Sequence, residues 1–231
     1  MVIVLLLAAG TGTRFNHSLP KQLEQLDGKP LIEYSLKVFN DHEQVDEINI
    51  VTSDELIDRV TEISRPYRNK VKQIIKGGST RSESSFAGLV SIKSNVNSKV
   101  LIHDAARPFI SPKIISECIE ALDTYDAVSV AVPSNETTFE VEEGQVDRIL
   151  NRNSLMRAQT PQGFRLQRII AAHKKLKTDE SFTPTDDCGV IAKYFPETPI
   201  GIIYGSERNI KVTFPEDMLT AQAMLKEENL S

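Results

Sequence analysis

The sequence has no tryptophan, two cysteines and four histidines among 231 residues. Cys118 and Cys188 are far apart rather than grouped at metal-ligand spacing, so we expect reduced thiols and no zinc site. The scattered histidines also argue against histidine-rich metal chemistry. We therefore expect the protein to bind its ligands through residues other than cysteine and histidine.

Long apolar runs and a basic excess are missing too. No run reaches the ~18 apolar residues of a membrane span, and neither a basic region nor a small-residue cleavage motif flags a leader. The net charge of −5 argues against a nucleic-acid partner. We expect a cytoplasmic protein that binds neither membrane nor nucleic acid, with 1–231 forming a single domain.

The first chemical signal is a glycine loop after a buried strand. Residues 2–9 are apolar and rich in Val and Leu, as in a strand covered on both faces. The loop that follows, Gly10-Thr11-Gly12-Thr13-Arg14, turns backbone N–H groups toward an anion, while Arg14 and Lys21 add positive charge. An ordinary strand-to-helix turn remains the alternative. Phe15 stands where a dinucleotide fingerprint needs its third glycine, and no P-loop motif is present.

Hydrophobic periodicity predicts alternating strands and helices along most of the chain. The alternation indicates an α/β fold, Rossmann-like and three-layered (α/β/α), with a mostly parallel mixed sheet. Further strands are expected at 45–52, 71–75, 100–103, 127–132 and 200–204. Helices are expected at 30–40, 54–67, 112–124, 166–177, 185–194 and 215–227.

Two later strand ends carry polar groups. The segment 77–84, GGSTRSES, predicts a second polar loop with Ser79 as helix N-cap, although a plain capped turn explains it equally. Asp104 follows the strand at 100–103, where open α/β sheets bind ligands, and is our expected Mg²⁺ ligand; the alternative is a turn or capping role. Arg107 fits either a phosphate contact or a structural ion pair.

Residues 134–151 interrupt the alternation. Two short β-like runs, at 137–141 and 145–150, surround Glu142-Glu143-Gly144 and predict a hairpin. Such an arm exposes apolar side chains and needs a partner. Farther on, Thr185 is the expected N-cap of the helix at 185–194, and the helix dipole accounts for Asp186 and Asp187 without a catalytic role.

Five separated segments resemble one family over nearly the whole chain. They are L-A-A-G-x-G-x-R-F, P-K-Q, G-G-x-x-R-x-x-S, T-P-Q and N-I-K-V-T. Together they resemble the sugar-phosphate nucleotidyltransferases, and more narrowly the methylerythritol-phosphate cytidylyltransferase family, which includes ribitol-phosphate cytidylyltransferases. The resemblance implies transfer of CMP from CTP to a polyol phosphate, with Mg²⁺, in a homodimer whose arm clasps the partner subunit.

The resemblance also implies roles for individual residues. Catalytic roles fall on Arg14, Lys21 and Lys211, and the metal falls on Asp104. The implied nucleotide contacts are Ala8, Ala9, Gly10, Gly12, Gly78, Ser79, Arg81, Ser84 and Ala105. The implied acceptor contacts are Arg107, Thr137, Arg152 and Thr160, the arm bringing Thr137 and Arg152 into the neighbouring site.

Three alternatives stay open at this point. Departures from the family at 136–139 (ETTF) and 185–189 (TDDCG) leave the acceptor open between methylerythritol phosphate and ribitol phosphate. An NAD-dependent dehydrogenase would need the missing third glycine and an acid earlier than Asp54. A regulatory subunit without turnover would tolerate loss of Lys21 or Asp104, yet both are present.

Overall fold

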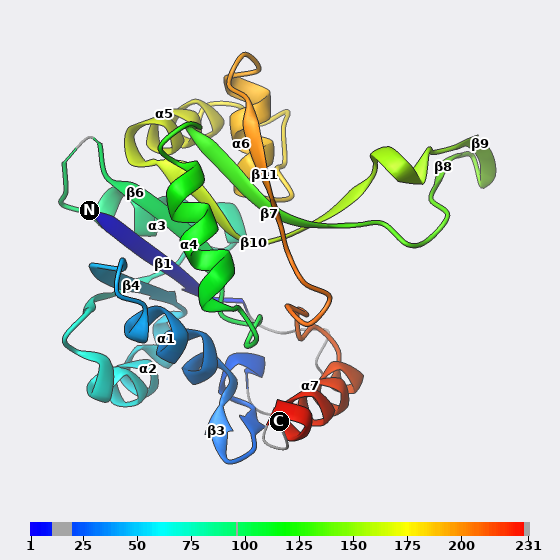
Figure 1. Ribbon diagram of the computed structural model, residues 1–231. Helices are drawn as coiled ribbons and strands as arrows, with labels where there is room; N and C mark the ends of the chain where they lie inside the picture. Colours follow the sequence, from blue (N-terminus) through cyan, green and yellow to red (C-terminus); the bar gives the residue numbers. More distant parts are fainter. Residues whose placement is uncertain (11–19, 96, 229–231) are drawn as a thin grey trace.

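The computed structural model describes residues 1–10, 20–95 and 97–228, which form a three-layer α/β/α structure (Figure 1). The central sheet has seven strands in the order β11-β7-β10-β6-β1-β4-β5, and only β10 runs antiparallel to its neighbours. Its strands are β1 (Val2–Ala8), β4 (Glu47–Thr52), β5 (Val71–Lys76), β6 (Lys99–Asp104), β7 (Ala127–Pro133), β10 (Met156–Arg165) and β11 (Ile200–Tyr204). The predicted fold class is confirmed.

Strand β1 lies near the middle of the sheet and is buried over its whole length. Its even-numbered side chains face a core formed with α1 (Leu31–Asp41), α2 (Ile57–Ser64) and α4 (Pro112–Ala121). The odd-numbered ones face a second core with α3 (Arg81–Ser91), α5 (Leu166–Leu176) and α6 (Asp187–Tyr194). Burial on both faces explains why β1 is continuously apolar instead of alternating.

Several predicted boundaries need correction. The expected helix at 54–67 is divided into η2 (Asp54–Leu56), α2 and η3 (Arg65–Tyr67). Helix α3 is capped by Thr80 and α6 by Asp186, each one residue beyond the predicted cap. The sequence interpretation also missed β10, which pairs with both β6 and β7.

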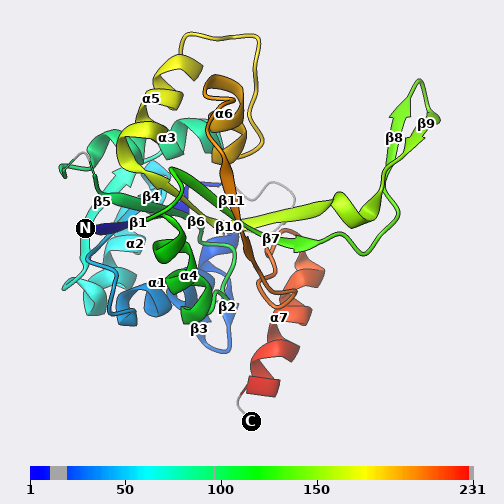
Figure 2. The ribbon, with the colours of Figure 1, turned by 45° about the horizontal axis from the view of Figure 1, so that its top comes forward.

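The predicted hairpin forms an arm that projects from the body of the molecule (Figures 1 and 2). It consists of β8 (Phe139–Glu142) and β9 (Gln145–Ile149), and all their residues are exposed. The turn places Glu143 and Gly144 at positive φ (50° and 79°), as tight hairpin turns require. Phe139, Val141, Val146 and Ile149 are each at least half exposed, so this arm buries little apolar surface within its own chain.

The C-terminal helix α7 (Pro215–Glu228) packs away from the main layers, beside the small hairpin of β2 (Gln25–Leu26) and β3 (Lys29–Pro30). Met218 and Ala221 form a third core there with Leu26, Leu31 and Val212. This core anchors Val212 and so the irregular segment that carries Lys211. Within the described ranges, no helix has the length and apolar character of a membrane span.

Candidate active site

A pocket of about 700 Å³ opens at the carboxyl ends of the parallel strands. Open α/β sheets bind ligands at this edge because successive strand ends present their loops together. The pocket walls come from the segments after β1, β4, β5 and β6, from η1 (Lys21–Leu23), and from residues 211–213. Its described lining residues are Leu7, Ala8, Ala9, Gly10, Lys21, Gln22, Ser53, Asp54, Glu55, Lys76, Gly77, Gly78, Ser79, Thr80, Arg81, Ser84, Asp104, Ala105, Ala106, Lys211 and Thr213.

The loops after β1 and β5 touch at Gly77. A Cβ atom on Gly77 would lie 2.7 Å from Ala9 Cβ and 2.7 Å from Ser84 Oγ, closer than side-chain atoms normally approach. The Gly77 N–H donates to Thr52 O over 2.8 Å and fixes the loop to the end of β4. Glycine is therefore required at this position to bring the two walls together.

The amino end of α3 is already satisfied by a capping box. Thr80 accepts from the Glu83 N–H, while the Glu83 carboxylate accepts from the N–H groups of Ser79 (2.7 Å) and Thr80 (3.4 Å). The Ser79 hydroxyl donates to the same carboxylate over 2.6 Å. Because this acid occupies the amino end of α3, the helix end already faces a negative charge and is a poor place for an anionic ligand.

Asp104 is the electrostatic centre of the described site. Its Oδ2 lies 2.6 Å from Lys211 Nζ, and its Oδ1 accepts from Arg81 Nε over 3.1 Å. Burial alone would raise the carboxyl pKa, but the charges of Arg81 and Lys211 hold the pKa of Asp104 well below its usual range. The carboxylate is thus ionised while only 10% of its side chain is exposed.

Two lysines from distant parts of the chain border the same space. Lys21, on η1, donates from Nζ to Val212 O over 3.2 Å, next to Lys211 in sequence. The Val212 N–H donates to Ala106 O over 2.8 Å, which joins this segment to the loop after Asp104. Residues 209–213 are irregular backbone. Their position is set by the third core and by these hydrogen bonds.

His103, Thr160 and Arg107 support the Asp104 loop from behind. The Thr160 hydroxyl accepts from the Asp104 N–H (3.1 Å) and lies 3.1 Å from His103 Nδ1, while His103 Nε2 lies 3.1 Å from Arg107 O. Burial lowers the pKa of His103 to about 4, so the ring is neutral at pH 7. A carbonyl only accepts, so Nε2 carries the proton and the Thr160 hydroxyl donates to Nδ1.

Arg107 is directed toward main-chain oxygens. Its Nη1 donates to Asn209 O over 2.7 Å, and its Nη2 donates to Ala158 O over 3.5 Å. Its Nε atom is buried and has no hydrogen-bond partner among the residues that the structure describes. Neither Arg107 nor Thr160 lines the pocket of this chain, and Thr137 and Arg152 are exposed on or beside the projecting arm.

The structure brings together every sequence-predicted nucleotide, catalytic and metal residue that it describes; the remaining two, Gly12 and Arg14, lie outside the described residues. Sequence reasoning missed several lining residues. Of these, Gln22 belongs to the P-K-Q segment and Gly77 to the G-G-x-x-R-x-x-S segment, and that membership was the available signal. Asp54 and Glu55 follow β4, Lys76 is the last residue of β5, and Lys76 Nζ pairs with Asp54 Oδ2 at 2.6 Å.

A divalent cation would find one carboxylate at the centre of this pocket. The described residues contain no cluster of three or more His, Cys, Asp or Glu side chains arranged for a metal. Mg²⁺ commonly uses one or two protein carboxylates and completes its shell with water and substrate phosphates. Asp104 fits that pattern because it stays ionised and faces a space large enough for a triphosphate.

A mostly parallel sheet that brings Lys21, Lys211 and the ionised Asp104 together at its carboxyl edge is suited to neutralising a nucleoside triphosphate, as a nucleotidyltransferase requires. Residues 2–227 match the family model of IspD, 2-C-methyl-D-erythritol 4-phosphate cytidylyltransferase. The chain therefore belongs to the IspD family of CTP-dependent cytidylyltransferases.

Individual relatives agree with this assignment. The chain is 40% identical to the 2-C-methyl-D-erythritol 4-phosphate cytidylyltransferase of Thermobifida fusca, covering 97% of this chain and 93% of the relative. The solved structure of 4-diphosphocytidyl-2C-methyl-D-erythritol synthase from Anaerococcus prevotii superposes with a TM-score of 0.87 at 29% identity, over 97% of this chain and 98% of that one.

A third relative is named for a different CDP compound, CDP-ribitol. The bifunctional ribulose 5-phosphate reductase/CDP-ribitol pyrophosphorylase Bcs1 of Haemophilus influenzae is 37% identical over 97% of this chain. The match covers 48% of that longer protein. The chain is thus similar both to proteins named for 2-C-methyl-D-erythritol 4-phosphate and to one named for CDP-ribitol.

Proposed function

We propose that this protein transfers CMP from CTP to 2-C-methyl-D-erythritol 4-phosphate, releasing pyrophosphate, as a step in making an isoprenoid precursor. The observation that carries the proposal is the convergence of Lys21, Lys211 and Asp104 on one pocket, in a chain of the IspD family. The motifs around Leu7–Gly10 and His103–Pro108 also resemble the methylerythritol branch more than the ribitol branch.

The chemistry requires charge neutralisation more than proton transfer. A phosphate monoester has a second pKa near 6, so the acceptor phosphate is mostly dianionic at pH 7 and attacks the α-phosphorus without a general base. Repulsion between the two anions is then the main barrier. Lys21 and Lys211, with Arg14 by resemblance, hold the triphosphate and stabilise charge that develops at the α-phosphorus.

Asp104 is the residue that we assign to a bound Mg²⁺. When bound there with the triphosphate oxygens, the cation would offset phosphate charge and favour the in-line arrangement. Asp104 already carries its negative charge, and its partner Lys211 Nζ at 2.6 Å is able to turn to a phosphate oxygen instead. Arg81 keeps a second carboxylate partner, Asp187 at 2.7 Å, when Asp104 turns to a ligand.

The acceptor side is assigned to two subunits. Apolar residues cover both strands of the arm and are exposed in the single chain, which favours a dimer that buries them. In this proposal the arm carries Thr137 and Arg152 into the partner's pocket, while Arg107 and Thr160 support the acceptor side from within each subunit. A complete site then needs Lys21 of one chain and Arg152 of the other.

Hybrid dimers test the shared site directly. In a hybrid of Lys21→Ala with Arg152→Ala, one site collects both defects and the other collects neither. Random exchange makes about half of the dimers hybrid, so roughly a quarter of all sites should regain full activity. If the co-refolded mixture contains hybrid dimers but stays as inactive as the separate variants, Arg152 acts within its own chain.

Ribitol 5-phosphate is the second candidate acceptor, favoured by the similarity to Bcs1 and by the departures at 136–139 and 185–189. Pyrophosphate release should be measured with both acceptors and with each of the four nucleoside triphosphates. We expect the highest kcat/KM for CTP with methylerythritol phosphate. A higher value with ribitol 5-phosphate would transfer the assignment to CDP-ribitol synthesis.

A further inference from the structure

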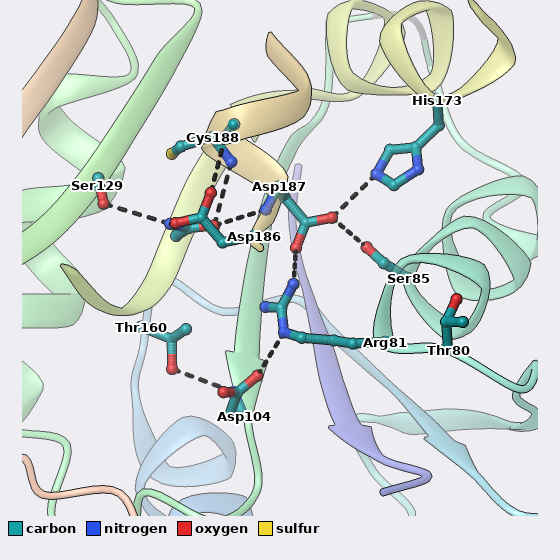
Figure 3. A network of polar contacts seen from close by, with 12 residues as sticks. Thr80, Arg81, Ser85, Asp104, Ser129, Thr160, His173, Asp186, Asp187 and Cys188 are labelled. Atoms are coloured by element: carbon teal, nitrogen blue, oxygen red, sulfur yellow. Dashed lines mark hydrogen bonds and ion pairs between the residues drawn. The ribbon is translucent and has the colours of Figure 1, made fainter. Parts of the chain in front are cut away.

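A buried carboxylate lies behind the pocket wall and holds Arg81 from the side opposite Asp104 (Figure 3). Asp187, in the first turn of α6, accepts from Arg81 Nη1 at Oδ2 over 2.7 Å. Its Oδ1 accepts from the Ser85 hydroxyl (2.6 Å) and from His173 Nε2 (2.9 Å). Only 1% of the Asp187 side chain is exposed, so no ligand in the pocket is needed to hold it.

The backbone of the same turn is fixed to the central sheet. Gln162 on β10 accepts from the Asp187 N–H (3.1 Å) and the Cys188 N–H (3.3 Å) through Oε1. Its Nε2 donates to Asp186 Oδ2 over 2.8 Å. Because β10 also supports the Asp104 loop through Thr160, both carboxylates that bind Arg81 are positioned by one strand.

The charges explain why two carboxylates are useful. Burial raises the pKa of Asp187, but the Arg81 charge and the His173 hydrogen bond outweigh it and lower the pKa to about 2. Asp187 therefore remains ionised at neutral pH and neutralises Arg81 by itself. Asp104 is then not required as the counter-ion of Arg81 and is available to charges that enter the pocket.

We propose that Asp187 is a positioning residue for nucleotide binding: it holds Arg81 in the pocket wall and so leaves Asp104 available to the ligand. Without the Asp187 charge, the guanidinium is drawn fully onto Asp104 and competes with the ligand for that carboxylate. The proposal rests on the proposed function, because CTP is taken as the ligand. It assigns to α6 a role that helix capping alone did not suggest.

The test measures CTP binding by calorimetry, in the presence of Mg²⁺ and without acceptor, so that no turnover occurs. Asp187→Asn keeps the size of the side chain and removes its charge, and we expect CTP affinity to fall about tenfold. The matched control is Asp186→Asn, the neighbouring carboxylate, which binds Gln162 and the Gly189 N–H but does not contact Arg81. The control should lower the melting temperature and leave CTP affinity within about twofold.

A double-mutant cycle distinguishes an effect of Asp187 on CTP binding through Arg81 from a general loss of protein stability. If Asp187 acts through Arg81, then Asp187→Asn should change CTP affinity by less than about twofold in an Arg81→Ala background. An equal loss in both backgrounds overturns the proposal. So does an Asp187→Asn protein with lowered melting temperature and wild-type CTP affinity.

If the Asp187→Asn protein does not fold, two milder substitutions test the same proposal. Ser85→Ala and His173→Gln each loosen the same carboxylate while its charge remains, and each should weaken CTP binding by about two- to threefold. Unchanged affinity in both variants refutes the positioning role. If the wild-type protein binds no CTP, the proposed function fails instead, so the two failures are distinguishable.

Discussion

Replacing Asp104 by asparagine should separate the charge of this carboxylate from its volume. The side chain is 10% exposed and receives Arg81 Nε at 3.1 Å and Lys211 Nζ at 2.6 Å. Hydrogen bonds to charged groups contribute about 1.5–3 kcal/mol each, but asparagine keeps one neutral acceptor. Arg81 also keeps Asp187, and the Lys211 side chain, 36% exposed, regains water.

We therefore expect Asp104→Asn to lower the free energy of unfolding by about 2 kcal/mol at pH 7. For a chain of this length that corresponds to a melting temperature lower by about 4–8 °C. Turnover should fall on the order of 10²-fold or more, because the substituted group is the proposed metal ligand. The protein should remain folded at 25 °C and retain its far-UV circular dichroism.

The pH dependence supplies a second check on the same variant. Because the native pKa of Asp104 is lowered, its stabilising contribution is complete above the unfolded pKa of about 3.9. It declines below that pH and is lost as the pH passes through the native pKa. The stability gap between wild type and Asp104→Asn, measured by denaturant unfolding, should thus be constant from pH 7 to about 5 and narrow below about pH 4.

Asp126→Asn is the matched control. Its carboxylate pairs with Arg168 at 3.0 Å but is 43% exposed and lies outside the pocket lining. The Asp126→Asn substitution should lower the free energy of unfolding by less than about 1 kcal/mol and leave turnover unchanged. Turnover of Asp104→Asn within about threefold of wild type would refute the electrostatic assignment of Asp104.

Three further changes test other parts of the site and arm. Lys21→Ala should lower kcat on the order of 10²-fold with little change in melting temperature, and normal kcat would remove it from the catalytic set. Gly77→Ala places a Cβ 2.7 Å from Ala9 and Ser84, so we expect a loss of about 1–3 kcal/mol in unfolding free energy, together with weaker CTP binding in calorimetry. Ile149→Asp puts a charge on the apolar arm and should shift the protein toward monomer in sedimentation, whereas an unchanged dimer would exclude this face from the interface.

The α/β class and most of the pocket residues could be predicted from the sequence. Strand β1 is recognisable because its apolar run reflects burial on two faces, and the helices have apolar periodicity that local sequence carries. Part of the site followed from position, because loops after parallel strands meet at one edge of the sheet. The individual nucleotide contacts and Lys211 followed from the family resemblance.

The long-range partners of these residues depend on the tertiary structure. The segment Met156–Arg165 contains proline and glycine and lacks strand-like alternation, yet it becomes β10 because β6 and β7 pair with it on both sides. Asp187 satisfied every local expectation for the first turn of a helix, and only the tertiary arrangement, in which α5 packs on both α3 and α6, turns its carboxylate to Arg81, 106 residues away. Contacts at such separation depend on how the layers pack, which no local pattern of residue types encodes.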